Sequence, residues 1–109
     1  MLASSVYVTT GTYEEAQTIA RAVVVDRLAA CANILGGISS VYLWQGEICE
    51  NSETALIIKT RPDLIDPLVE RIKAIHSYDC PCIVVLGVVD GNVDYIKWIE
   101  KETNYPNLY

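Results

Sequence analysis

The stretch Tyr42-Leu43-Trp44-Gln45-Gly46-Glu47 lies between two long extended runs of the 109-residue chain. These runs are Ala32 to Trp44 and Glu47 to Thr60, so Gln45-Gly46 is read as a two-residue hairpin connection. Gly36-Gly37 interrupts the first run and predicts a bulge or a bend. The centre of the chain is therefore predicted to be a long antiparallel hairpin.

A strand and a helix are predicted before this hairpin. Leu2 to Thr9 is short and β-branched, and it ends at Thr10-Gly11, which is typical of a strand. Thr12-Tyr13-Glu14-Glu15 has the pattern of a capping box, in which Thr12 and Glu15 each accept the backbone N–H of the other, so a helix begins there. Apolar residues then recur at helical spacing, at Ala16, Ile19, Ala20 and Val23.

A second helix, a strand and a last helix are predicted after the hairpin. Arg61-Pro62-Asp63 ends the second extended run and opens a helix. The apolar residues of that helix share one face: Ile65, Leu68, Ile72 and Ile75. Ile83 to Val89 is a strand, and Asn92 caps a short C-terminal helix. The order β-α-β-β-α-β with a terminal helix predicts an α+β, ferredoxin-like split βαβ fold with an antiparallel sheet, as one domain over residues 1–109.

Two of the predicted strands are apolar on both faces. They contain Ala55-Leu56-Ile57-Ile58 and Ile83-Val84-Val85-Leu86, so both faces of the sheet are expected to be buried. The two main helices cover only one face. The other face must be covered by the terminal helix or by another subunit, and the pattern favours a homo-oligomer.

Composition and charge exclude several classes of protein. Hydrophobic residues make up 51% of the chain and charged residues 20%, which is typical of a folded domain. The net charge of −6 has the wrong sign for nucleic acid or an anionic membrane surface. The longest apolar run, Pro81 to Val89, is far shorter than the roughly 20 residues of a membrane helix. With no export signal in the first residues, a cytoplasmic protein with reduced cysteines is expected.

Five stretches of the sequence resemble one known family. They are Arg27-Leu28-Ala29-Ala30-Cys31-Ala32-Asn33, Tyr42-Leu43-Trp44-Gln45-Gly46-Glu47, Ile58-Lys59-Thr60, His76-Ser77-Tyr78-Asp79-Cys80-Pro81 and Gly91-Asn92-Val93-Asp94-Tyr95-Ile96-Lys97-Trp98. In this order, over almost the whole chain, they resemble the CutA divalent-cation tolerance proteins. The resemblance implies a small cytosolic homotrimer of ferredoxin-like fold with a role in metal tolerance.

The chain departs from this family at two positions. Ser77 stands where the family usually has a proline, and Cys82 stands where it usually has an acidic residue. The thiol pair Cys80 and Cys82 is therefore peculiar to this sequence. A copper role that the resemblance implies for the shared cysteine attaches to Cys31 alone.

Four residues are candidate metal ligands: Cys31, His76, Cys80 and Cys82. Imidazole and thiolates suit soft ions, so copper is the first candidate and zinc the second. Pro81 favours an extended backbone at Cys80, which would place the two neighbouring sulfurs on one side. The alternative is that His76 is stabilised by the helix C-terminus and that the thiols only fill the core.

Aromatic residues near the turns allow a second hypothesis. In the family that the chain resembles, residues such as Trp44, Tyr42 and Tyr78 line a cleft between subunits together with Lys59. The protein could then be a trimeric signalling module of the PII-like kind that binds a small molecule, with packing of the aromatics as the simpler alternative. Carboxylates on the hairpin are interpreted as a solvated rim: Glu47, Glu50 and Glu53.

The sequence argues against an enzyme. Cys31 and His76 are the only obvious nucleophile and base, and neither lies in a recognised catalytic motif. A Gly-rich phosphate-binding loop is also missing from the sequence. A binding protein is therefore expected.

Overall fold

Every strand and helix predicted from the sequence is present in the computed structural model, which describes residues 2–105. The strands are β1 (Ala3–Thr10), β2 (Cys31–Trp44), β3 (Glu47–Thr60) and β4 (Ile83–Val88). The helices are α1 (Tyr13–Val25), α2 (Ile65–Ile75) and α3 (Val93–Glu102), with a short 3-10 turn at Pro62–Leu64. The predicted strand ends differ from these by at most one residue.

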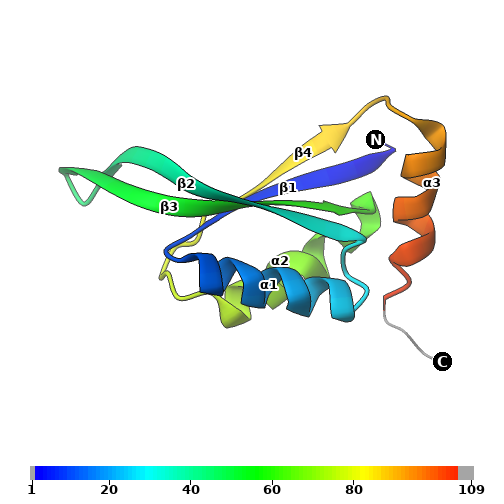
Figure 1. Ribbon diagram of the computed structural model, residues 1–109, viewed down its shortest axis with the longest axis horizontal. Helices are drawn as coiled ribbons and strands as arrows, with labels where there is room; N and C mark the ends of the chain where they lie inside the picture. Colours follow the sequence, from blue (N-terminus) through cyan, green and yellow to red (C-terminus); the bar gives the residue numbers. More distant parts are fainter. Residues whose placement is uncertain (1, 106–109) are drawn as a thin grey trace.

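The strands form one antiparallel sheet in the order β2-β3-β1-β4. Because β3 lies between β1 and β2, the unit formed by β1, α1 and β2 is split, as the ferredoxin-like prediction requires. Helices α1 and α2 lie side by side against one face of the sheet, and α3 lies at one end of it (Figure 1).

The core lies between the sheet and the pair α1 and α2. It consists of fully buried aliphatic side chains from both layers: Val6, Val8, Leu56 and Ile58 from the sheet, Ile19 and Val23 from α1, and Leu68 and Ile72 from α2. Burial of each such side chain stabilises the fold by about 1.5–3 kcal/mol relative to exposure to water. The apolar residues that recur at helical spacing in α1 and α2 and those that alternate in the strands therefore form one core.

The turn and the bulge of the hairpin are confirmed. Gln45 and Gly46 have φ angles of 51° and 82°, as a type I′ turn requires at both central residues. The register of β2 against β3 shifts between Leu35 and Ile38, and Gly37 within this bulge has a φ angle of 70°. A long hairpin arm, residues 38–53, therefore extends past the rest of the sheet (Figure 1).

The capping box at the start of α1 differs from the prediction in one bond. The Glu15 N–H donates to the Thr12 hydroxyl at 3.1 Å, as predicted. The Glu15 carboxylate, however, accepts the N–H of Gly11 at 3.2 Å rather than that of Thr12. Its other oxygen accepts the Ser77 N–H at 2.7 Å, so the carboxylate lies between two backbone segments instead of folding onto the cap residue.

The sheet face opposite α1 and α2 stays open within the subunit. Val84 and Leu86 of β4 are 50% and 56% exposed. The terminal helix does not cover them, because Ile99 of α3 packs against Ala3 and Ala30 at one end of the sheet. Of the two covers that the sequence allowed for this face, the terminal helix covers only the end next to Ala3, and the part at Val84 and Leu86 has no cover within the subunit.

Candidate functional site

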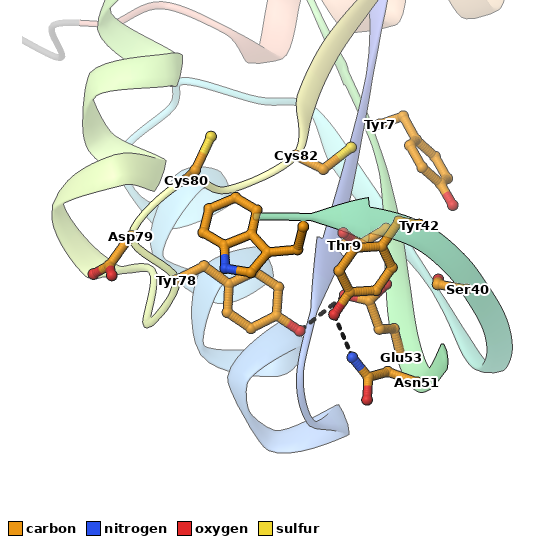
Figure 2. Close-up of a pocket in the computed structure, with 11 residues that line it drawn as sticks. Tyr7, Thr9, Ser40, Tyr42, Asn51, Glu53, Tyr78, Asp79, Cys80 and Cys82 are labelled. Carbon is orange, nitrogen blue, oxygen red and sulfur yellow. Dashed lines mark hydrogen bonds between the residues drawn. The ribbon is translucent and has the colours of Figure 1, made fainter. Parts of the chain in front are cut away.

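A cavity of about 570 Å³ lies between the hairpin arm, β1 and the segment 78–82 that precedes β4 (Figure 2). Aromatic rings form much of its wall: Tyr7 from β1, Tyr42 and Trp44 from β2, and Tyr78. The wall also contains two carboxylates, those of Glu53 and Asp79, and two thiols, those of Cys80 and Cys82. The cavity has the size of pockets that hold small molecules, about 300–1,000 Å³.

Glu53 and Tyr78 form the most buried polar contact of this wall. The Tyr78 hydroxyl donates to Glu53 Oε2 at 2.8 Å, and Glu53 is only 9% exposed (Figure 2). Burial, followed by the hydrogen bond and the charge of Glu53, raises the pKa of Tyr78 well above its ordinary value. The phenol therefore stays neutral and holds a charged carboxylate at the edge of the cavity. The prediction of a solvated rim is therefore wrong for Glu53, which is buried. Glu47 and Glu50 are exposed, as predicted.

His76 positions the backbone of Tyr78. Its ring is fully buried, Nδ1 accepts the Tyr78 N–H at 3.0 Å, and Nε2 donates to the Thr9 carbonyl at 2.8 Å. Because a backbone N–H can only donate, this pattern corresponds to the neutral ring with its proton on Nε2. The histidine thus binds β1 rather than the last carbonyls of α2, and a metal bond would replace one of the two hydrogen bonds.

Glu15 holds the same segment from the side of α1. Its carboxylate accepts the Ser77 N–H and lies 3.8 Å from His76 Nδ1. Burial raises the pKa of Glu15, but the hydrogen bonds from Ser77 and Gly11 outweigh it, so the pKa lies below its ordinary value. The ionised carboxylate therefore fastens residues 76–78 next to the cavity.

The four candidate metal ligands do not meet at one point, and only Cys80 and Cys82 share a location. Cys80 is exposed and Cys82 is half-buried, and both line the cavity (Figure 2). The sulfur of Cys31 lies at the other end of β3, 3.4 Å from the Tyr95 hydroxyl. This hydrogen bond, together with burial, raises the pKa of Tyr95 to about 12. All four cysteines of the chain are free thiols.

A complete metal cage is not formed by the residues that the structure describes. Within residues 2–105, no three His, Cys, Asp or Glu side chains converge closely enough to hold an ion. A hard divalent ion, which takes six or more oxygen ligands, has no such cage in this part of the chain. Two thiols on one wall still suit a soft ion of low coordination number such as Cu(I).

The structure places the predicted cleft residues in two locations. Trp44 and Tyr78 line the cavity. Lys59 lies outside it, where its ammonium donates to the Asn33 side chain and its backbone pairs in register with Cys31. Tyr7 and Glu53 were missed by sequence reasoning. Tyr7 alternates with the buried Val6 and Val8, which was the available signal that it faces the open side of the sheet.

No helix within residues 2–105 combines the length and apolar character that crossing a membrane requires.

The profile of the family described as CutA1 divalent ion tolerance protein matches residues 4–102. The divalent-cation tolerance protein CutA of Thermus thermophilus is 45% identical to this chain over 98 residues, which are 90% of this chain and 95% of that protein. The chloroplastic protein CutA 1 of Oryza sativa is 43% identical over 98 residues, and the chain spans only 55% of its length.

Solved structures agree with these sequence matches. The divalent cation tolerance protein from Thermus thermophilus superposes with a TM-score of 0.91 at 44% identity, covering 93% of this chain and 98% of that one. CutA1 from Oryza sativa superposes with a TM-score of 0.91 at 41% identity, covering 93% and 94%. The predicted fold and the resemblance read from the sequence are both confirmed. The chain belongs to the CutA1 divalent ion tolerance protein family.

Proposed function

We propose that the protein is a homotrimeric, copper-binding member of this family, with Cys80 and Cys82 as its first metal ligands. The observation that carries the proposal is the presence of both thiols on the wall of one open cavity. Thiolates select soft ions, so Cu(I) is favoured and Zn(II) is the weaker candidate. The role is binding, in keeping with a family named for ion tolerance rather than for a reaction.

The other two candidate ligands have different parts in this proposal. His76 joins the copper site only by giving up its hydrogen bond to Tyr78. Cys31 lies outside the cavity and would form a separate, single-thiol site. Cys80 and Cys82 therefore account for the tightest binding.

Anaerobic titration of the reduced protein with Cu(I) tests this site. The double variant Cys80→Ser/Cys82→Ser is expected to lose high-affinity binding, because a hydroxyl does not replace a thiolate as a ligand for a soft ion. Cys49→Ser is the matched control, since Cys49 lies on the hairpin arm outside the cavity wall. A loss caused by Cys31→Ala and not by the double variant would place the site at Cys31 and overturn the proposal.

Exposed apolar surface supports assembly into a trimer. The hairpin arm exposes large apolar side chains to solvent: Val41, Leu43, Trp44 and Ile48. Neither edge strand, β2 or β4, has a second partner within residues 2–105, and the sheet face at Val84 and Leu86 is open. Neighbouring copies of the chain would bury both surfaces. The number three follows from the family resemblance.

Light scattering after size exclusion tests the trimer. The expected mass is three times 12.1 kDa and stays constant on dilution. Trp44→Ala is expected to weaken assembly, because aromatic anchors carry much of the energy of an interface. Val25→Ala, at an exposed position of α1, is the control. A monomer at all concentrations would refute this part of the proposal.

The cytoplasm is the compartment we propose, because four free thiols persist in a reducing environment. Relatives named chloroplastic and periplasmic are known, so the compartment varies between those proteins. Fractionation of the producing cells, with a cytosolic and an exported marker, tests it. Recovery with the exported marker would contradict it.

A second candidate function is the binding of a small molecule in the same cavity, as in the PII-like hypothesis. The cavity volume of about 570 Å³ and the aromatic wall favour it. Binding of a small molecule would not require the thiols.

A further inference from the structure

The turn between β4 and α3 contains an aspartyl-glycyl pair. Asp90 is followed by Gly91, whereas no other aspartate and no asparagine of the chain is followed by glycine. A backbone nitrogen can attack the side-chain carboxyl carbon of the aspartate that precedes it. Glycine permits this attack most readily, because it has no Cβ and few restrictions on its backbone angles. The sequence therefore singles out Asp90 for this reaction.

The geometry of the turn places the two reacting groups side by side. The Gly91 N–H donates to Asp90 Oδ1 at 2.8 Å, so the nitrogen lies next to the carboxyl group that it would attack. Groups that are held close together react faster than groups that meet by diffusion. Asp90 and Gly91 belong to neither a strand nor a helix, so the peptide group between them lies outside the regular hydrogen bonding of the fold.

The fold distinguishes Asp90 from the next candidate for this chemistry. Asn51 is followed by the small Ser52, and asparagine undergoes the same ring closure. Both residues lie in β3, where Asn51 pairs with Ser40 and Ser52 pairs with Ser39. The Asn51 side chain also donates to the Tyr42 hydroxyl. Strand pairing and this hydrogen bond hold Asn51 away from ring closure, and the turn gives Asp90 no such restraint.

The turn lies apart from the surfaces through which we expect copies of the chain to assemble. It joins β4 to α3 at the end of the sheet opposite to the hairpin arm (Figure 1). Asp90 and Gly91 are both exposed. The reaction requires water and neither a ligand nor an open cavity.

We infer that Asp90 converts spontaneously to isoaspartate through a cyclic imide formed with Gly91. The Gly91 nitrogen loses its proton and bonds to Asp90 Cγ, while the bond from Cγ to its hydroxyl breaks and one water leaves. Water then opens the ring. Attack at Cγ restores aspartate, whereas attack at the backbone carbonyl carbon of Asp90 breaks the bond of that carbon to nitrogen and leaves the main chain running through Cγ. One water is released and one is taken up, and nothing is oxidised or reduced.

The product would loosen α3. Isoaspartate adds one carbon to the main chain between two fixed points. The Val88 carbonyl accepts the Leu2 N–H at 3.0 Å, and the Asn92 side chain caps α3 by accepting the Asp94 N–H at 3.0 Å. Ile99 is the buried residue of α3, so the helix is held by little buried surface. Segments with few buried contacts open at a low free-energy cost.

Incubation of the native protein at neutral pH and physiological temperature tests the inference. Isoaspartate is measured over several weeks by enzymatic carboxyl methylation with labelled S-adenosylmethionine, and it is located by fragmentation of the tryptic peptide 74–97. That peptide also contains Asp79 and Asp94, which serve as internal references. We expect isoaspartate to form at residue 90 about tenfold faster than at either reference. Equal rates at the three residues would overturn the inference.

Two variants assign the reaction to this pair. Gly91→Ala is expected to slow it about tenfold, because the added methyl group hinders the approach of the nitrogen to Asp90 Cγ. The added Cβ would lie 3.5 Å from Ile96 Cδ1, an ordinary contact, so the fold is kept. Asp90→Glu keeps the charge but must close a larger ring, and it is expected to lose the product at residue 90. An unchanged rate in either variant would contradict the assignment.

The same chain unfolded in guanidinium chloride gives the rate without the fold. We expect the folded protein to react within about tenfold of that rate, because the turn already brings the two groups together. A larger reduction in the folded protein would show that the fold or the assembly protects Asp90, and it would overturn the inference. Binding of Cu(I) and the mass of the assembly are separate measurements, so this result leaves the proposed function untouched.

Hydrogen exchange tests the effect on α3. Incubated wild-type protein is compared with fresh protein and with equally incubated Asp90→Glu. We expect faster amide exchange in α3 of the incubated wild type alone, with exchange in β1 and α1 unchanged. Equal exchange in the modified and fresh proteins, or equal loosening of α3 in incubated Asp90→Glu, would contradict the effect assigned to isoaspartate.

Discussion

Replacing Tyr78 by phenylalanine removes the hydroxyl that donates to Glu53 Oε2 at 2.8 Å. Hydrogen bonds to charged groups contribute about 1.5–3 kcal/mol, and Tyr78 is 36% exposed, so water would replace part of the lost bond. We therefore expect the free energy of unfolding to fall by about 1–2 kcal/mol. The remaining cost arises because the Glu53 carboxylate, in a residue only 9% exposed, would lose this donor.

Urea unfolding at fixed protein concentration, followed by far-UV circular dichroism, measures this change, since assembly couples stability to concentration. A double-mutant cycle with Glu53→Gln isolates the pair and should give a coupling energy of about 1 kcal/mol. Tyr13→Phe, at a 49% exposed tyrosine of α1, is the control. If Tyr78→Phe and Tyr13→Phe agree within ~0.3 kcal/mol, the contact does not stabilise the wall and the reasoning is refuted.

Three further changes test the packing, the electrostatics and the turn. Leu68→Ala, at a fully buried position of α2, should lower the free energy of unfolding by about 3–5 kcal/mol, and a loss below ~1 kcal/mol in urea unfolding would contradict the core described here. Glu15→Gln should destabilise the protein at pH 7 and not at acid pH. The pKa of Glu15 is lowered in the folded state, so the ionised carboxylate stabilises the protein fully above the ordinary pKa of 4.5, and this stabilisation is lost as the pH falls through the lowered pKa. If urea titrations show that Glu15→Gln destabilises the protein equally at pH 3 and at pH 7, this prediction is contradicted. Gln45→Asn should raise stability by about 0.5 kcal/mol, because asparagine tolerates the positive φ of 51° better than glutamine does; a lower thermal midpoint would argue against strain at this turn.

Local chemistry was sufficient to predict the order and type of the elements. The type I′ turn follows from a two-residue connection with glycine at its second position, and the bulge follows from Gly36-Gly37. The buried faces of α1 and α2 follow from the spacing of their apolar residues. The uncovered apolar face was also foreseeable, because residues 83–86 are apolar at every position.

The site needed the three-dimensional arrangement, because its contacts join residues far apart in the chain. His76 meets the carbonyl of Thr9 across 67 positions, and Tyr78 meets Glu53 across 25. Nothing in the neighbourhood of Glu53 along the chain distinguishes it from the exposed Glu47 and Glu50. Which of the three carboxylates is buried depends on the register of the hairpin and on the distance from its tip. Side chains alternate between faces, so Glu47 and Glu53 share a face and Glu50 lies on the other, but Glu47 lies beside the turn, opposite Trp44, whereas Glu53 lies next to Tyr78. The bulge between Leu35 and Ile38 sets that register, and so the packing of the sheet, rather than any motif, brings Glu53, Tyr78 and the two thiols to one cavity.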